Sequence, residues 1–141
     1  MINEIRIFPM SAKDPDASTL SRLEYYLTDK LPNGQDGKFY YPNKPGMKFS
    51  GGEVLVLFQY NGTVRGCGIL VGLEEEPKIE FNKSYKGYFQ FKPESLKYFK
   101  IPITKDELSL ISPKFKKFGQ SKQKLEIEIL DDLEKLIKKH S

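Results

Sequence analysis

Three consecutive aromatic residues, Phe39, Tyr40 and Tyr41, are the first candidates for chemistry in this sequence. They lie in residues 32–46, a stretch so rich in glycine, proline and asparagine that we expect a loop. Flat side chains on a loop could stack against the face of a nucleobase, and Lys44 beside them could contact nucleic acid. The alternative is that one or two of these rings plug the end of the hydrophobic core.

A second group of candidates occupies the basic turn, residues 112–123, which read "SPKFKKFGQSKQ". Gln120 and Ser121 could hydrogen-bond a base edge or a phosphate. The lysines of the turn could hold a nucleic-acid backbone, and binding would then weaken with salt. These lysines are Lys114, Lys116, Lys117 and Lys122. Arg65, near the tip of a predicted hairpin, is a further candidate for a phosphate contact.

The charge of the chain is modest but uneven. The net charge is +4, yet residues 78–124 hold twelve lysines against four acidic residues, interleaved with aromatic residues. Phosphate contacts combined with stacking surfaces would have this composition. The alternative interpretation is a solvated lysine surface over an aromatic core, because charge alone bears on partners and not on fold.

The residues required by several kinds of catalysis are missing. His140 is the only histidine and lies one residue from the end, so a Ser-His-Asp or Cys-His mechanism has no base and a histidine metal site is excluded. Cys67 is the only cysteine, which excludes an intramolecular disulfide and a cysteine zinc cluster. The sequence has no P-loop, HExxH or EF-hand motif. We therefore expect a binding protein with no catalytic residues, no metal and no cofactor.

The elements that must position these candidates begin with a strand and a helix. Residues 3–8, "NEIRIF", alternate in polarity and predict a strand. Residues 14–31 predict a helix in which Asp14 or Asp16 caps the first turn beside Pro15. Its apolar face is expected to consist of Leu20, Leu23, Leu27 and Leu31.

The stretch 51–72, "GGEVLVLFQYNGTVRGCGILVG", predicts a β-hairpin. Asn61-Gly62 supplies the two positive-φ positions of a type I′ turn between apolar runs. Val54, Val56, Phe58, Ile69 and Val71 are expected to alternate against a core. The glycines of the second strand, Gly66, Gly68 and Gly72, are interpreted as bulges or close approaches in a strongly bent strand.

The remaining chain predicts further strands and two helices. Residues 85–91 and 95–103 are expected to be strands, and Thr104 to Glu107 forms a capping box at the start of a short helix. Residues 124–129, "KLEIEI", predict a last strand before a terminal helix at 130–139. The fold class is therefore α+β, a small, curved, mostly antiparallel β-barrel with flanking helices.

The length fits one domain, residues 1–141, which could be the N-terminal part of a longer protein. No apolar stretch approaches the length of a membrane span, and the first ten residues lack the pattern of a signal peptide. We therefore expect a soluble, cytoplasmic protein with no membrane partner.

The order of these segments resembles the PUA-like group of folds and, within it, the EVE and YTH branch. The resemblance covers roughly the last two-thirds of the chain and rests on the hairpin, on "YFQFKPESLKYFKIPITKDEL", on the basic "FKKFGQSKQ", on "LEIEI" and on the terminal helix. The first hairpin strand begins with Gly51-Gly52-Glu53, so the acid at the strand start is Glu where the family pattern has Asp. The chain has no tryptophan, which these domains commonly use in the base pocket, and tyrosine could replace it.

The resemblance implies a small barrel with a concave pocket that reads a nucleobase, often a modified one. Such domains serve as recognition modules of modification-dependent restriction enzymes, so DNA is the first expected partner, with a nuclease domain or subunit carrying the catalysis. An RNA-binding module of the same fold is the alternative. A third possibility is a protein-interaction or small-molecule domain that uses the aromatic residues as an apolar anchor.

Overall fold

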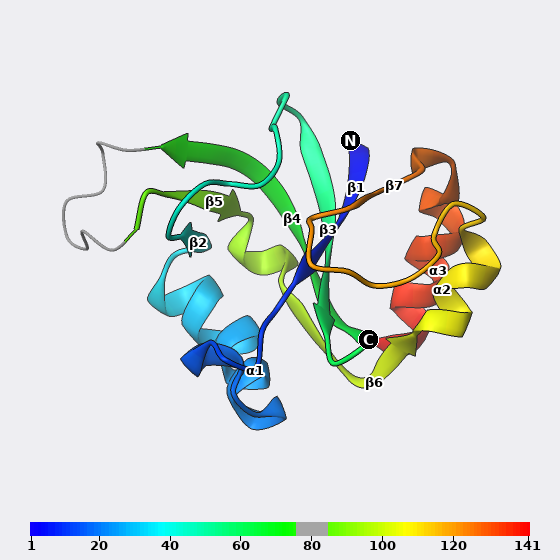
Figure 1. The fold of residues 1–141 in the computed structure, drawn as a ribbon, viewed down its shortest axis with the longest axis horizontal. Coiled ribbons are helices and arrows are strands. Elements are labelled where there is room, and N and C mark those ends of the chain that lie inside the picture. The colour runs from blue at the N-terminus through cyan, green and yellow to red at the C-terminus, as the bar shows by residue number, and fades with distance from the viewer. Residues whose placement is uncertain (76–84) are drawn as a thin grey trace.

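The structure is a computed structural model that describes residues 1–75 and 85–141 (Figure 1). Its strands are β1 (Ile2–Pro9), β2 (Lys38–Tyr41), β3 (Glu53–Tyr60), β4 (Thr63–Glu75), β5 (Gly87–Phe91), β6 (Lys97–Thr104) and β7 (Lys124–Leu125). Its helices are α1 (Leu20–Tyr25), α2 (Lys105–Ile111) and α3 (Leu130–His140), with a π-helix η2 (Tyr26–Gly34) and the short 3-10 turns η1 (Pro15–Ala17), η3 (Pro93–Ser95) and η4 (Ile127–Ile129).

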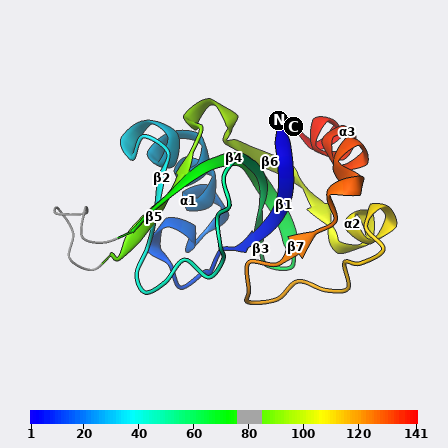
Figure 2. The same ribbon diagram turned by 90° about the horizontal axis from the view of Figure 1, so that it is seen from above.

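The strands form one sheet in the order β2-β5-β4-β3-β1-β7, and β6 pairs with β4 beside this path. All pairings are antiparallel except that of β1 with β3. Within residues 1–75 and 85–141 no ladder joins the end strands β2 and β7. The mixed α+β class is confirmed, but the closed barrel is wrong, because the strands make an open, curved sheet (Figures 1 and 2).

The long strand β4 curves the sheet by changing partner along its length. One edge pairs with β3, while the other pairs first with β6 and then with β5. Register shifts occur between Val64 and Gly66 and between Leu70 and Gly72. At Gly66 a Cβ atom would lie 2.4 Å from the carbonyl oxygen of Lys97, so only glycine permits this approach. The predicted glycine bulges and close approaches are therefore confirmed.

The hairpin between β3 and β4 turns at Asn61 and Gly62, whose φ angles are 48° and 74°. These values confirm the predicted type I′ turn. The predicted alternation is wrong on β4, where Leu70 is buried while Ile69 and Val71 are only half-buried, and on β3 both faces are buried. Val54, Val56 and Phe58 pack on one face of β3, while Leu55 and Leu57 are also buried on the other face.

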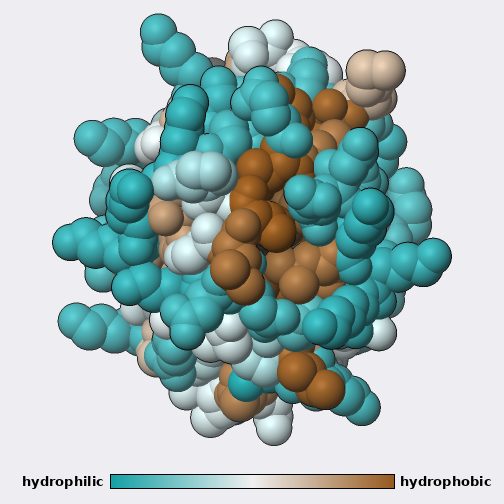
Figure 3. Space-filling view, turned by 90° about the vertical axis from the view of Figure 1, so that its right-hand side faces the viewer, coloured by the Kyte–Doolittle hydropathy of each residue, from teal (hydrophilic) through white to brown (hydrophobic). Residues whose placement is uncertain are grey.

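Two hydrophobic cores result, one on each face of the sheet. One lies beneath α2 and α3 and includes Leu108 and Leu133. The other lies beneath α1 and η2 and is rich in phenylalanine, including Phe8, Phe58, Phe89 and Phe91. On the outside of the molecule, the side that carries α2 and α3 shows a band of apolar side chains bordered by hydrophilic ones (Figure 3).

The first predicted helix is divided into three parts. The Asp14 carboxylate caps the turn η1 by accepting a hydrogen bond from the Asp16 amide. Thr19 caps α1 in the same way, and the chain then continues as the π-helix η2. Three of the four predicted apolar positions, at 23, 27 and 31, are buried, but Leu20 is 42% exposed. Leu20 differs because it is the first residue of α1, next to its N-cap, and the turn η1 with Ala17 packs against the core there instead.

Two further expectations are corrected. Residues 38–41 were expected in a loop but form β2, because a turn at Asp36 and Gly37, with φ angles of 55° and 79°, directs them antiparallel to β5. The strand expected at 124–129 is limited to Lys124–Leu125 and followed by η4. There the Glu126 carboxylate binds the Ser112 hydroxyl and the Lys114 amide, which directs the chain away from β1 toward α3.

The capping box of α2 is confirmed, since Thr104 accepts the amide of Glu107 and Glu107 accepts the amide of Thr104. In the part of the chain that the structure describes, no helix has the length and apolar character needed to cross a membrane.

The approach at Gly66 predicts a strong stability effect. We expect Gly66→Ala to lower the free energy of unfolding by about 1–3 kcal/mol, because the added methyl group would overlap the carbonyl of Lys97 and the side chain of Leu27. Gly119→Ala is the matched control, because a Cβ there meets no atom within 4 Å. Urea denaturation measures both variants, and equal stability of the two would contradict this account of the bend.

The ion pair at the start of β3 predicts a dependence on pH. Hydrogen bonding from Lys92, and then from the N-terminal amine, holds the pKa of Glu53 below its usual value. The pair therefore stabilises the fold above the unfolded pKa of Glu, about 4.3, and this contribution is lost as the pH falls through the lower folded pKa. Glu53→Gln should reduce stability near pH 7 and leave it unchanged at about pH 2.

Urea denaturation at the two pH values measures this difference, with Glu128→Gln as the control at an exposed carboxylate. A deficit of the Glu53 variant that persists in acid would show that the ion pair is not its cause.

Candidate functional site

A cavity of about 600 Å³ opens where the end of β1, η1, the end of η2 and β2 meet. We call it the aromatic cavity. Its aromatic wall consists of Tyr26, Phe39, Tyr40 and Tyr85. Its polar groups are Asp14, Asp16, Lys30, Gln35, Asp36 and Lys38. The volume lies within the range of about 300–1,000 Å³ that is typical of small-ligand sites.

Tyr40 and Tyr85 form the outer part of the aromatic wall. Their ring centroids lie 5.2 Å apart, and Tyr40 also contacts Tyr88 at 5.6 Å. The ammonium group of Lys38 lies over the ring of Tyr88 at 5.3 Å. Burial raises the pKa of the Tyr40 phenol, with smaller contributions from Tyr88 and Tyr85. This side of β2 therefore presents flat neutral rings with one cation beside them.

Phe39 and Tyr26 form the inner part of the wall. Phe39 packs against Phe58 with a ring separation of 6.1 Å and meets Tyr26 edge-on at 6.2 Å. Tyr26 is 5% exposed, and its burial raises the pKa of the phenol despite a hydrogen bond with Gln35. Its hydroxyl therefore stays protonated. The Gln35 amide also donates to the Lys38 carbonyl at 2.7 Å, which fixes the start of β2 against η2.

The three aspartates that line the cavity make different contacts. Asp14 accepts the Asp16 amide at 2.9 Å as a cap, and Asp16 pairs with the Lys30 ammonium at 2.6 Å, which raises the pKa of Lys30. Asp36 has a positive φ of 55°, and its backbone carbonyl accepts the Gln90 amide at 2.9 Å. Among the described residues no side chain hydrogen-bonds or pairs with the exposed Asp36 carboxylate, which differs in this respect from Asp14 and Asp16.

The three aromatic candidates have different environments. Phe39 and Tyr40 line the cavity. Tyr41 is 4% exposed, and its hydroxyl donates to the Glu74 carbonyl at 3.2 Å while the ring lies against Gly87. The alternative of a core-filling ring therefore describes Tyr41 in this conformation, because residue alternation along β2 directs it into the phenylalanine-rich core.

The basic candidates lie outside the cavity. Gln120, Ser121 and the lysines at 114, 116 and 117 are exposed on the basic turn, and Lys44 is exposed on residues 42–52. These two segments lie on the same side of the sheet (Figures 1 and 2). Lys122 differs from the other candidates on these two segments because it is half-buried. A joint contact of these residues with nucleic acid stays a prediction.

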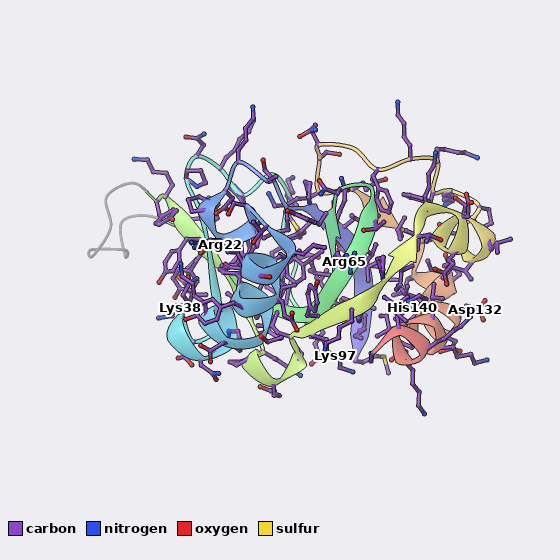
Figure 4. All side chains as sticks on the ribbon, turned by 90° about the horizontal axis from the view of Figure 1, so that it is seen from below. Arg22, Lys38, Arg65, Lys97, Asp132 and His140 are labelled. Atoms are coloured by element: carbon purple, nitrogen blue, oxygen red, sulfur yellow. The ribbon has the colours of Figure 1, made fainter. Side chains whose placement is uncertain are left out.

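Arg65 has a structural contact in this fold. One guanidinium nitrogen donates to the carbonyls of Phe99 at 3.3 Å and Lys100 at 2.8 Å, beside the bulge where β4 meets β6. Figure 4 shows it in the middle of the molecule, well separated from Lys38 on β2. A phosphate contact by Arg65 stays a prediction, and such a contact would lie outside the aromatic cavity.

Several residues of the cavity were not among the candidates from sequence, namely Tyr26, Gln35, Asp36, Lys38 and Tyr85. The dipeptide Asp36-Gly37 is a recognisable turn signal, which could have indicated that the aromatic triplet returns as a strand. Tyr26 and Tyr85 carry no such signal, because their approach depends on how η2 packs against β2 and where β5 begins.

Within residues 1–75 and 85–141 no group of three or more His, Cys, Asp or Glu side chains is placed to hold a metal ion.

Comparisons with known proteins identify the fold. No protein-family model and no curated protein matches the sequence. A solved structure does match, the YTH domain of the Zygosaccharomyces rouxii MRB1 protein in complex with N6-methyladenosine RNA. The TM-score is 0.54 at 14% sequence identity, over 99% of this chain and 89% of that chain. The fold is YTH-like. The predicted resemblance to YTH domains is thus confirmed for the fold alone, while a restriction-enzyme context has no support from these comparisons.

Proposed function

We propose that this chain is a non-catalytic module that binds RNA and reads an extruded, modified nucleobase in the aromatic cavity. The observation that carries the proposal is the cavity itself, which combines flat rings with an unpaired carboxylate. The YTH-like fold supports it, because the matched domain was solved with N6-methyladenosine RNA. For the same reason RNA replaces DNA as the favoured partner, and the DNA-reading role beside a nuclease becomes an arm of the test.

Stacking is the first contribution of the cavity. A base that leaves its neighbours loses its stacking energy, and aromatic side chains compensate for that loss. Tyr40 and Tyr85 offer adjacent ring surfaces at the edge of the sheet, and Tyr26 closes the inner end. Every base has an aromatic face, so these rings provide affinity and do not by themselves select the base.

Selection is assigned to the polar groups of the cavity. A carboxylate accepts hydrogen bonds and cannot donate them, so Asp36 fits a base edge that presents an N–H donor, such as the exocyclic amine of adenine, cytosine or guanine, and disfavours an edge that presents only acceptors. An N6-methylated adenine keeps one N–H on its amine and still meets this requirement. The methyl group would add apolar contact with the rings.

The backbone of the RNA is assigned to lysines outside the cavity. Lys38 borders the aromatic wall, and residues 42–52, which include Lys44, lie on the same side of the sheet as the basic turn (Figures 1 and 2). Such contacts are independent of base identity, and affinity should fall as salt rises.

Removing the outer ring tests the site. We expect Tyr40→Ala to weaken binding of a short single-stranded N6-methyladenosine RNA by about 5- to 150-fold, the equivalent of one lost stacking contact of about 1–3 kcal/mol. Tyr25→Ala is the matched control, because Tyr25 is 57% exposed on α1 and outside the cavity. Fluorescence anisotropy at two salt concentrations measures both variants.

The same assay includes unmodified RNA and the corresponding methylated and unmodified DNA, with the flanking positions randomised. Tighter binding of DNA than of RNA would restore the DNA-reading alternative. An absence of binding to every oligonucleotide at low salt would refute the proposal and favour a protein or small-molecule ligand.

The role of Asp36 is tested by changing the base and the residue together. Replacing adenine by unsubstituted purine removes the exocyclic amine without adding another donor, so the wild-type protein should bind the purine RNA more weakly. Asp36→Asn should abolish this preference, because an amide can donate as well as accept, and asparagine tolerates the positive φ at this position. Anisotropy measures the ratio of the two affinities, and an unchanged ratio in the variant would exclude Asp36 as the selecting group.

A further inference from the structure

Lys122 has an unusual position that begins with its backbone. The pairing of β7 with β1 places Leu125 opposite Ile5 and Lys124 opposite Arg6, and the Ile7 amide donates to the Gln123 carbonyl at 2.9 Å. Gln123 therefore lies opposite Ile7, and the next residue in the same register, Lys122, lies opposite Phe8. The Arg6 guanidinium donates to the Lys122 carbonyl at 2.9 Å and fixes the backbone there. The side chain is therefore directed onto the same face of the sheet as Phe8.

The ammonium group lies between the aromatic face and residues 42–52. It is 5.4 Å from the ring centroid of Phe8 and 5.5 Å from that of Phe89. A Cβ atom at Gly46 would lie 3.4 Å from the Lys122 Nζ atom, so the backbone of this segment passes directly beside the amine. The two rings attract the cation and hold it in place.

No carboxylate compensates this charge among the residues that the structure describes. Lys30 pairs with Asp16 and Lys92 with Glu53, whereas the Lys122 amine has no hydrogen bond or ion pair there. Burial lowers the pKa of Lys122. A half-buried cation without a counter-ion is costly, and such groups are concentrated at binding sites.

The surroundings favour an anion with more than one negative charge or charged oxygen. Residues 42–52 and the basic turn, which border the amine, together contain six lysines and no acidic residue. A carboxylate or a single phosphodiester carries one negative charge, whereas the successive phosphates of an RNA strand present charges both to Lys122 and to its neighbouring lysines.

We propose that the Lys122 ammonium, held over Phe8 and Phe89 beside Gly46, is a phosphate-binding site distinct from the aromatic cavity. In its biological form the phosphate is that of the bound RNA backbone, an assignment that rests on the function proposed above. A free phosphate or nucleotide is the other source of the same chemistry, and the experiment distinguishes them.

The experiment combines a direct probe of the amine with two variants. The protein is labelled with ¹³C at the lysine ε-carbons, and the Lys122 signal is identified by its loss in Lys122→Met, which keeps an unbranched apolar stem over the rings. Inorganic phosphate, a nucleoside 5′-monophosphate and the N6-methyladenosine RNA are titrated separately. Lys124→Met is the matched control, since Lys124 is exposed on the same segment. RNA binding by all three proteins is measured by anisotropy across a salt series.

We expect the Lys122 signal to move with phosphate and with RNA. We also expect Lys122→Met to weaken RNA binding and to make the slope of log affinity against log salt shallower by about 1 compared with Lys124→Met. A signal that does not move with phosphate, together with equal RNA binding by the two variants, would overturn the phosphate site and leave the function of the cavity intact.

The two proposals fail in different ways. A Lys122 signal that moves with inorganic phosphate or the nucleotide, in a wild-type protein that binds neither RNA nor DNA, would support the anion site and refute the nucleic-acid function. The titration of the wild-type protein remains decisive if the Lys122 variant does not fold.

Discussion

The close approach of β4 to β6 at Gly66 is the constraint on which the rest of the structure depends. With only a hydrogen atom at this position, the Lys97 carbonyl lies where a side chain would otherwise be. The bulge next to Gly66 bends β4, so that one edge of this strand pairs with β6 in its first part and with β5 in its last part. Because β5 in turn pairs with β2, the bend determines where the aromatic wall stands relative to β1 and η2. A straight β4 would separate these elements and remove the cavity.

Alternation along β2 then separates structural from exposed aromatic residues. Phe39 and Tyr41 project toward the phenylalanine-rich core, whereas Tyr40 projects to the other side, where it meets Tyr88 and Tyr85. The cavity lies at the edge of this arrangement, so Phe39 can contribute to both the core and the wall. A register shift of one residue would exchange these roles.

Charge pairing distinguishes groups that maintain the fold from groups that remain for a ligand. Glu53 with Lys92, Asp16 with Lys30 and the capping carboxylate Glu107 have their partners within the protein. In the described part of the chain Asp36 and Lys122 do not, although both are held firmly by their backbone contacts. In the proposed function, the Asp36 carboxylate accepts a hydrogen bond from the base, and the Lys122 cation beside residues 42–52 holds a phosphate.

The sequence by itself determined the features that depend on neighbours in the chain. The Asn61-Gly62 turn, the Thr104–Glu107 capping box and the bulge-forming glycines of β4 were predicted because their geometry is decided within a few residues. Only the tertiary structure decided that the sheet stays open, that residues 38–41 pair as an edge strand, that Tyr26 and Tyr85 join the aromatic wall and that Lys122 lies over two rings. These features depend on strand register and packing between distant segments, for which no local pattern carries the information.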